Sequence, residues 1–231
     1  LNVGCASMRL LESTGQLMFF EKGDQAFRAS SEIDPHQSAL WLFWGMLELT
    51  CAKRVVCIEE ERREHFLSAI KKFEVADLCE PDHPLVWLKW SEALMYIGSL
   101  DENCLYLKEA LEKIKMSLTK DSHCVESWYF YGKILTELGS YFQDERILSE
   151  AKEKYHKGLK IDPDFAPLHY GLAETCMDLT EITEDIQFLE ESAKHFKKVS
   201  GLAKELPPQF WLYYGIVHLR LGESKKALAE V

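Results

Sequence analysis

The sequence predicts an all-α fold, an α-solenoid of stacked antiparallel helix pairs. The first observation is an internal period, because Trp87, Trp128 and His169 recur at an offset of 41 residues, and such periods are typical of repeat architectures. The second is helical spacing, since apolar residues such as Trp128, Tyr131 and Leu135 lie three and four positions apart. The third is an acidic residue before proline at the end of three copies, as in the segment IDP, because the residue before proline avoids helical geometry.

The period divides residues 1–231 into one array. The expected repeats are 1–37 (partial), 38–83, 84–124, 125–165, 166–207 and 208–231 (partial). In each repeat we expect a short first helix that stops near a glycine, as in YIGS, ELGS and RLGE, since glycine is common just after a helix. The second helix is amphipathic, with Leu148, Ala151 and Tyr155 on its apolar face.

The segment VESWYFYGKILTELGS, residues 125–140, crowds four aromatic residues beside a glycine. By the period, Trp128 and Tyr131 should pack in the core, where truncating either would cost about 3–5 kcal/mol. Tyr129 should lie on the opposite face, toward a binding groove. The pattern does not assign Phe130 to either face.

Gly132 raises a separate question, because a glycine inside a helix costs about 1 kcal/mol relative to alanine. We expect it there because the helix of Tyr155 must approach closely at this point. Small residues hold the equivalent position in other copies, namely Gly45, Ser91 and Ala173.

The composition indicates which kinds of partner the protein could bind and in which compartment it lies. The net charge of −11 argues against nucleic acid, which requires a basic surface, and is compatible with a basic or amphipathic protein partner. The seven cysteines form no C-x-x-C pair, so we expect a reducing, cytoplasmic compartment rather than disulfides or a zinc site. No apolar run approaches the roughly 20 residues of a membrane span. A chain that starts without methionine is expected to be a piece of a longer protein.

The residues of the third full copy resemble the tetratricopeptide repeat, a helix–turn–helix unit of 34 residues. The resemblance rests on Trp128, Tyr131, Gly132, Ala151, Tyr155, Gly158 and Pro163. It implies a right-handed superhelix in which the first helices line a concave groove. Because each copy here is about seven residues longer, we expect lengthened second helices or an elaborated inner turn.

Motifs for catalysis or metal binding are missing from the sequence. His65 is not part of H-E-x-x-H, and no two histidines are four positions apart. His169 is expected to be a packed, hydrogen-bonded core residue. The charged run 58–65 is either a solvated helix face or a partner-specific insertion, and Cys51 and Cys57 are either inert packing or reactive thiols. We therefore predict no enzyme activity, no metal and no cofactor.

The resemblance also implies one set of groove residues for each first helix. In the first two full copies these are Ala39, Leu42, Met46 and Leu49, then Leu85, Leu88, Glu92, Met95 and Tyr96. In the later copies they are Glu126, Tyr129, Lys133 and Glu137, then Tyr170, Glu174, Met177 and Asp178, then Leu212, Ile216 and Arg220.

These residues predict an apolar, Met-rich N-terminal groove and a middle part suited to an extended peptide with Lys or Arg. We therefore expect a non-enzymatic interaction scaffold or co-chaperone that binds a peptide or a partner helix. A clamp for acidic C-terminal peptides is not expected, because its positions hold Leu88, Glu92, Tyr129 and Lys133. The alternatives are a structural segment that packs through its ends or convex face, and a regulatory array attached to a catalytic domain elsewhere.

Overall fold

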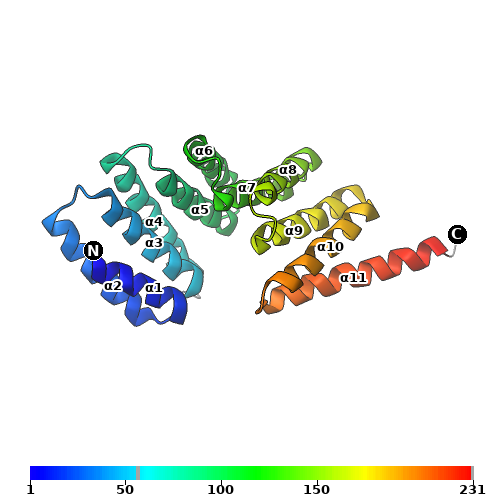
Figure 1. Cartoon of the computed structure of the whole chain (residues 1–231), viewed down its shortest axis with the longest axis horizontal. Helices are drawn as coiled ribbons and strands as arrows, with labels where there is room; N and C mark the ends of the chain where they lie inside the picture. Colours follow the sequence, from blue (N-terminus) through cyan, green and yellow to red (C-terminus); the bar gives the residue numbers. More distant parts are fainter. Residues whose placement is uncertain (56–57, 230–231) are drawn as a thin grey trace. The chain divides into compact units, whose positions relative to one another are not determined.

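The computed structural model describes residues 1–55 and 58–229, with side chains up to residue 223, and this part of the chain contains eleven α-helices and no strand (Figure 1). Their bounds are α1 Asn2–Thr14, α2 Leu17–Ile33, α3 Ser38–Arg54, α4 Glu59–Cys79, α5 Pro84–Leu100, α6 Cys104–Lys120, α7 Val125–Phe142, α8 Glu145–Ile161, α9 Ala166–Thr183, α10 Ile186–Leu202 and α11 Pro208–Ala229. The all-α prediction is confirmed. Cys57 lies outside the described residues.

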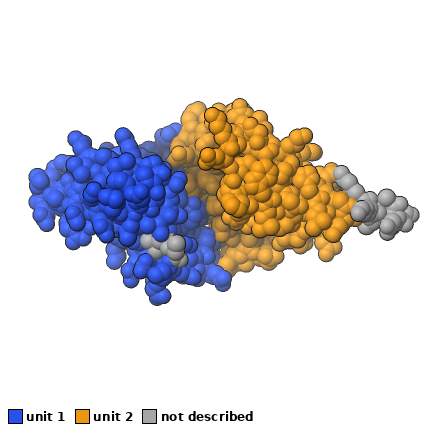
Figure 2. All heavy atoms as spheres, turned by 90° about the horizontal axis from the view of Figure 1, so that it is seen from below, with its two compact units in different colours: residues 1–122 blue, residues 123–231 orange. Residues whose placement is uncertain are grey.

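The helices form hairpins of sequence neighbours, from α1 with α2 to α9 with α10, and α11 packs on α10. The chain divides into two compact units, residues 1–122 and 123–231, which Figure 2 colours separately. The first unit contains α1–α6 and the second contains α7–α11. No helix among the described residues combines the length and apolar content that crossing a bilayer requires.

In the hairpins α5/α6, α7/α8 and α9/α10 the additional residues are helical, because the inner turns span only residues 101–103, 143–144 and 184–185. Helices α5, α6 and α8 have 17 residues each, so both helices of a pair are long. Of the two alternatives, lengthened second helices are present and an elaborated inner turn is not. Side-chain caps define the start of the second helices. Asn103, Asp144 and Asp185 each accept a hydrogen bond from the backbone N–H two residues on.

The glycines expected to end the first helices lie inside them instead. A Cβ at Gly98 would stand 2.9 Å from Leu107, and one at Gly139 would stand 2.7 Å from Leu148. These glycines therefore allow the second helix to approach. The residue that caps the end of α7 is Gln143, which has a left-handed φ of 53°. The prediction that these glycines follow the helix ends is wrong. Glycine is favoured both at a helix end and where two helices approach closely, because it has no Cβ, and the second reason applies here.

The close approach predicted at Gly132 is present. A Cβ there would stand 2.5 Å from Cε1 of Tyr155, whose side chain is 1% exposed. In the first unit, Gly45 meets the ring of Phe73 in the same way, with a Cβ distance of 2.6 Å. An aromatic ring on a small residue is thus a repeated packing element of the hairpins.

The aromatic segment of α7 packs differently from the prediction. Phe130 is the buried residue, at 6% exposed. Trp128 and Tyr131 are only half-buried and stack with a centroid distance of 6.2 Å. Both rings pack against the paired helix α8, as predicted, with the ammonium groups of Lys154 and Lys157 over them, but they lie at the edge of the core rather than inside it.

The structure also places His169 and the charged run 58–65. His169 is 8% exposed and its Nε2–H donates to the carbonyl of Pro163 at 2.9 Å, as expected for a packed core histidine. The charged run forms the exposed first turns of α4, where Glu59, Glu60 and Glu61 lie near the helix N-terminus. This position suits carboxylates because the helix dipole is positive there.

Candidate binding site

The second unit has a hollow of about 390 Å³ formed by α7, α9 and α11. Its lining residues are mostly polar and acidic, namely Lys133, Thr136, Glu137, Ser140, Glu174, Met177, Asp178, Glu181 and Tyr213. The helical register explains the grouping, because residues three and four apart share one helix face. Lys133, Thr136, Glu137 and Ser140 follow this spacing on α7, as do Glu174, Met177, Asp178 and Glu181 on α9.

Hydroxyl groups tie the two walls of this acidic hollow together. The Oγ1 atoms of Thr136 and Thr175 are 2.8 Å apart. Ser140 donates from Oγ to Oδ2 of Asp178 at 2.6 Å. These two contacts join α7 to α9 and fix the carboxylate of Asp178, while Thr175 also donates to the carbonyl of Gly171 within α9 at 2.8 Å.

Burial raises the pKa of two carboxyl groups in the acidic hollow. It raises the pKa of Glu174, and the ammonium of Lys133 opposes this shift only in part. It also raises the pKa of Asp178 against the hydrogen bond from Ser140, with Glu181 and Glu137 adding like charge. The hollow therefore concentrates carboxylates that are poorly solvated and would gain from a cation.

The structure brings together only part of the set expected for the second unit. Lys133, Glu137, Glu174, Met177 and Asp178 all line the acidic hollow. The other expected residues lie elsewhere, and the sequence did not indicate four of the lining residues, namely Thr136, Ser140, Glu181 and Tyr213.

Two tyrosines expected in the groove are packed against other rings. Tyr129 contacts Phe130 and Phe165 at centroid distances of 5.0 and 6.5 Å. Tyr170 lies 5.8 Å from Phe196, and burial raises its pKa. Both are half-buried against these rings and neither is among the lining residues of the acidic hollow, so their role in binding stays a prediction.

The other expected positions of this unit flank the hollow or point to solvent. Glu126 is exposed in the first turn of α7, and Leu212 is 59% exposed on α11. Ile216 is half-buried. Arg220 lies 3.4 Å from Oε1 of Glu181, so it adds a cation at the edge of the hollow.

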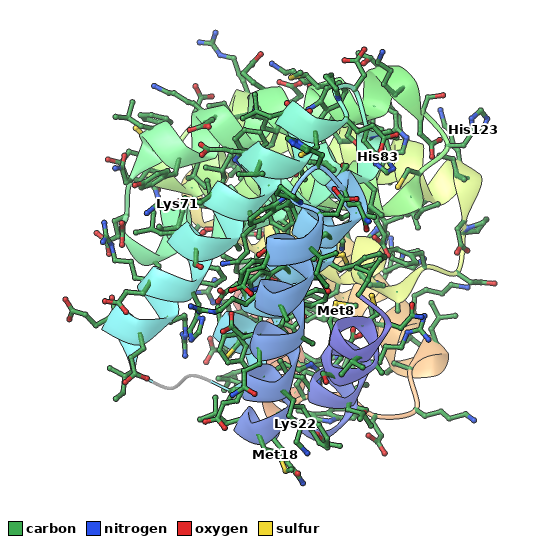
Figure 3. The ribbon with its side chains drawn as sticks, turned by 90° about the vertical axis from the view of Figure 1, so that its left-hand side faces the viewer. Met8, Met18, Lys22, Lys71, His83 and His123 are labelled. Carbon is green, nitrogen blue, oxygen red and sulfur yellow. The ribbon has the colours of Figure 1, made fainter. Side chains whose placement is uncertain are left out.

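The first unit carries a smaller hollow of about 180 Å³ that includes the expected groove residues Met46, Leu49 and Glu92. Met8 of α1, which Figure 3 shows beside α2, lines it as well, and α1 also contacts α3. Glu92 is 3% exposed and binds the ammonium groups of two lysines, Lys53 at 2.6 Å and Lys89 at 3.0 Å. The expectation of an apolar surface is therefore wrong here, because an ion network crosses it.

The remaining expected residues of the first unit do not share one surface. Tyr96 lines a different hollow of about 410 Å³ with Lys53 and Phe66. Leu42, Leu88 and Met95 are 4%, 2% and 1% exposed, so they are core residues rather than surface residues. Their burial follows from the packing of α3, which contacts α1 and α5. Leu85 is half-buried and Ala39 is exposed.

A polar network between α3 and α4 was not anticipated. The buried carboxylate of Glu48 accepts hydrogen bonds from His65 Nδ1 at 2.6 Å, and from Ser68 and Lys72 at 2.8 Å each. His65 Nε2 lies 3.7 Å from Sγ of Cys51. These contacts to Cys51 and Glu48 raise the pKa of His65 to about 10.

The same network lowers the pKa of Glu48. Burial opposes ionisation of Glu48, but hydrogen bonds from His65 and Lys72 outweigh it and lower the pKa. Cys51 is fully buried, which removes its sulfur from contact with a substrate. The network therefore stabilises the α3/α4 hairpin.

Repeated hairpins with an aromatic ring on a small residue define a tetratricopeptide-like (TPR-like) helical repeat protein. Among solved structures, PilW, a type IV pilus biogenesis factor, matches with a TM-score of 0.69 at 14% identity, over 99% of this chain and 90% of its own. TTC0263, a TPR protein of Thermus thermophilus, matches with 0.62 at 14% identity, over 94% and 99%.

A third match is YrrB, described as a TPR protein with an unusual peptide-binding site, with a TM-score of 0.56 at 16% identity over 89% of this chain and 87% of its own. No protein-family model matches the sequence, and no curated protein matches it. At these identities the likeness establishes the TPR fold.

Proposed function

We propose that this chain is a protein-interaction scaffold that acts by binding, and that the acidic hollow of the second unit takes a Lys or Arg side chain of an extended peptide. The observation that carries this proposal is the convergence of Glu137, Glu174, Asp178 and Glu181 in one hollow of about 390 Å³. Met177 and Tyr213 in the same lining offer apolar contact to the aliphatic stem of such a side chain.

The electrostatics favour a cation as the ligand. Glu174 and Asp178 ionise less readily than exposed carboxyls because they are partly buried. A basic side chain entering the hollow replaces lost solvation with charge-assisted hydrogen bonds, which are about twice as strong as neutral ones. The net charge of −11 adds long-range attraction for a basic segment.

Two further features support the proposal. YrrB shares the fold and is described as having a peptide-binding site. The six described cysteines are all free thiols, which suits the reducing compartment that we propose. A co-chaperone is one form of such a scaffold, with basic peptide segments of its clients in the acidic hollow.

The proposal is tested by selecting short random peptides on the immobilised chain. We expect selected peptides to be enriched in Lys and Arg for the wild type. The double variant Glu174→Gln/Asp178→Asn keeps the shape of both side chains and should lose that enrichment. Glu153→Gln, at an exposed carboxylate of α8, is the control and should retain it. Equal enrichment in the double variant would refute the proposal.

A further inference from the structure

Three histidines meet in the second unit, one from each of three successive helices. His156 lies on α8, His169 on α9 and His195 on α10. The ring centroids of His169 and His195 are 5.2 Å apart, and those of His156 and His195 are 6.4 Å apart. This histidine cluster therefore lies where α9 packs on both α8 and α10.

The hydrogen bonds of the histidine cluster require neutral rings. The Nε2–H of His169 donates to the carbonyl of Pro163 at 2.9 Å, so a neutral His169 ring has its lone pair on Nδ1. That atom lies 3.0 Å from Nδ1 of His195, whose N–H can donate to it. Only one proton fits between the two atoms, because a second would place two N–H groups against each other. Protonation of His169 therefore breaks this contact.

The charges on α8 and α10 also oppose protonation of the histidine cluster. The ammonium groups of Lys152 and Lys160 on α8 repel a positive charge on His156, and Lys152 does the same to His195. Glu191 of α10 faces both rings with the opposite charge. Its carboxylate already binds the ammonium of Lys152 at 2.6 Å.

The groups around α9 do not reverse this balance. Asp164, which precedes α9 and faces His169, binds the ammonium of Lys198 at 2.8 Å. The thiol of Cys176 stays protonated because burial raises its pKa to about 12. Glu191 and Asp164 are thus each paired with a lysine, so their charge is already compensated when an imidazolium forms.

We propose that the histidine cluster is an acid-sensitive switch, which holds α10 on α8 and α9 while its rings are neutral and favours separation of α10 in acidic solution. Separation would remove Leu189, Phe196 and Val199 of α10 from the core. Histidine suits this role because its ordinary pKa places its charge change between about pH 5 and 8. The inference concerns the attachment of α10 rather than the acidic hollow, so it goes beyond the proposed function.

The direction of the pH effect follows from the closed arrangement. Burial and the neighbouring His169 lower the pKa of His195 from 6.5 to about 4, and partial burial lowers the pKa of His156 as well. When α10 separates, water solvates the rings and the pKa of His195 returns to 6.5. Its stabilising contribution is therefore complete above pH 6.5 and is lost as pH falls through about 4. In this window each pH unit raises the opening constant of α10 by up to about tenfold for one histidine.

Native-state hydrogen exchange, read by mass spectrometry, measures the opening constant of α10 in the 231-residue chain. The rates are corrected for the pH dependence of the chemical exchange step. We expect the opening constant of residues 186–202 to be at least about tenfold higher at about pH 5 than at about pH 7. Helix α5, residues 84–100 of the first unit, contains no histidine and is the internal reference.

Three variants assign the effect to the histidine cluster. His195→Gln keeps an N–H donor for His169 but stays neutral, so it should reduce the rise to less than about threefold. His156→Gln, at the exposed ring of the cluster, should give an intermediate rise because one fewer imidazolium forms. The control is His123→Gln, at an exposed histidine of the same unit, which should keep the full rise.

An opening constant of α10 that is equal at the two pH values would overturn the proposal. A full rise in His195→Gln would do the same, and if that variant does not fold, a full rise in His156→Gln is decisive. An equal rise in α5 would also overturn it, because acid would then unfold the whole chain rather than separate α10. None of these results depends on peptide binding in the acidic hollow.

Discussion

Tyr155 lies so close to Gly132 that a Cβ on the glycine would stand 2.5 Å from the ring. The ring is 1% exposed, so it has no room to move away. We predict that Gly132→Ala destabilises the protein by about 1–3 kcal/mol, the usual cost of overpacking. Gly215→Ala, at a position of α11 where no described heavy atom lies within 4 Å of the Cβ position, should be neutral or stabilising by up to about 1 kcal/mol because alanine is the better helix former. Urea unfolding followed by circular dichroism measures both, and equal effects would contradict this packing.

Phe130 and Trp128 provide a second comparison within α7. Phe130 is 6% exposed, so Phe130→Ala should cost about 3–5 kcal/mol. Trp128 is half-buried, with the ammonium of Lys157 over its ring, so Trp128→Ala should cost less than about 2 kcal/mol because less apolar area is lost. The same urea titrations test this order, and a larger loss for Trp128 would show that its ring is a core element after all.

The ionised carboxylate of Glu174 in the acidic hollow should lower the stability of the fold while it favours binding of a cation. Burial raises the pKa of Glu174 from its ordinary value of 4.5, so the folded state prefers the protonated form. That stability is fully present below pH 4.5 and is lost as pH rises through the higher folded-state pKa. At neutral pH, Glu174→Gln should therefore stabilise the fold, by on the order of 1 kcal/mol.

Thermal melts across this pH range test that expectation. The gain from Glu174→Gln should shrink below pH 4.5. Glu153→Gln, at an exposed position of α8, is measured beside it as the control. A variant that is less stable than the wild type at neutral pH would mean that the ionised Glu174 is well stabilised without a ligand.

The Glu48–His65 pair should make stability sensitive to alkaline pH. The pKa of His65 rises from 6.5 to about 10 in the fold. Its contribution is therefore complete below pH 6.5 and is lost as pH rises through about 10. We expect a loss of about 1.5–3 kcal/mol over this window, the value of a hydrogen bond between charged groups.

His65→Gln should flatten that dependence, whereas His36→Gln, at an exposed histidine, should leave it intact. Urea midpoints measured at several pH values between neutral and alkaline solution provide the comparison. Parallel curves for the wild type and His65→Gln would assign the alkaline loss to other groups.

The period of 41 residues predicted the helix pairs and the contact of Gly132 with Tyr155, because both depend on spacing along the chain. It misassigned Gly98 and Gly139, since a glycine that ends a helix and one that admits a neighbouring side chain look alike in sequence. It left Phe130 unassigned and placed Trp128 in the core, whereas Phe130 is buried and Trp128 is half-buried with the ammonium of Lys157 over its ring.

The acidic hollow was only partly predictable. Helical spacing placed Lys133 and Glu137 on one face of α7 and Glu174 and Asp178 on one face of α9. Tyr213 was missed because its role depends on the packing of α11, which no spacing within one repeat encodes. The Glu48–His65 contact was missed for a similar reason, since it joins two helices whose mutual rotation is set by core packing.

The most direct test of the central claim is titration calorimetry with one Lys- or Arg-rich peptide from the selection experiment. We predict that Glu174→Gln/Asp178→Asn weakens its binding at least about tenfold, because the charge-assisted hydrogen bonds to the peptide are lost. Glu153→Gln should leave the affinity unchanged. Unchanged affinity in the double variant, with its fold intact by circular dichroism, would contradict the claim that the acidic hollow is the binding site.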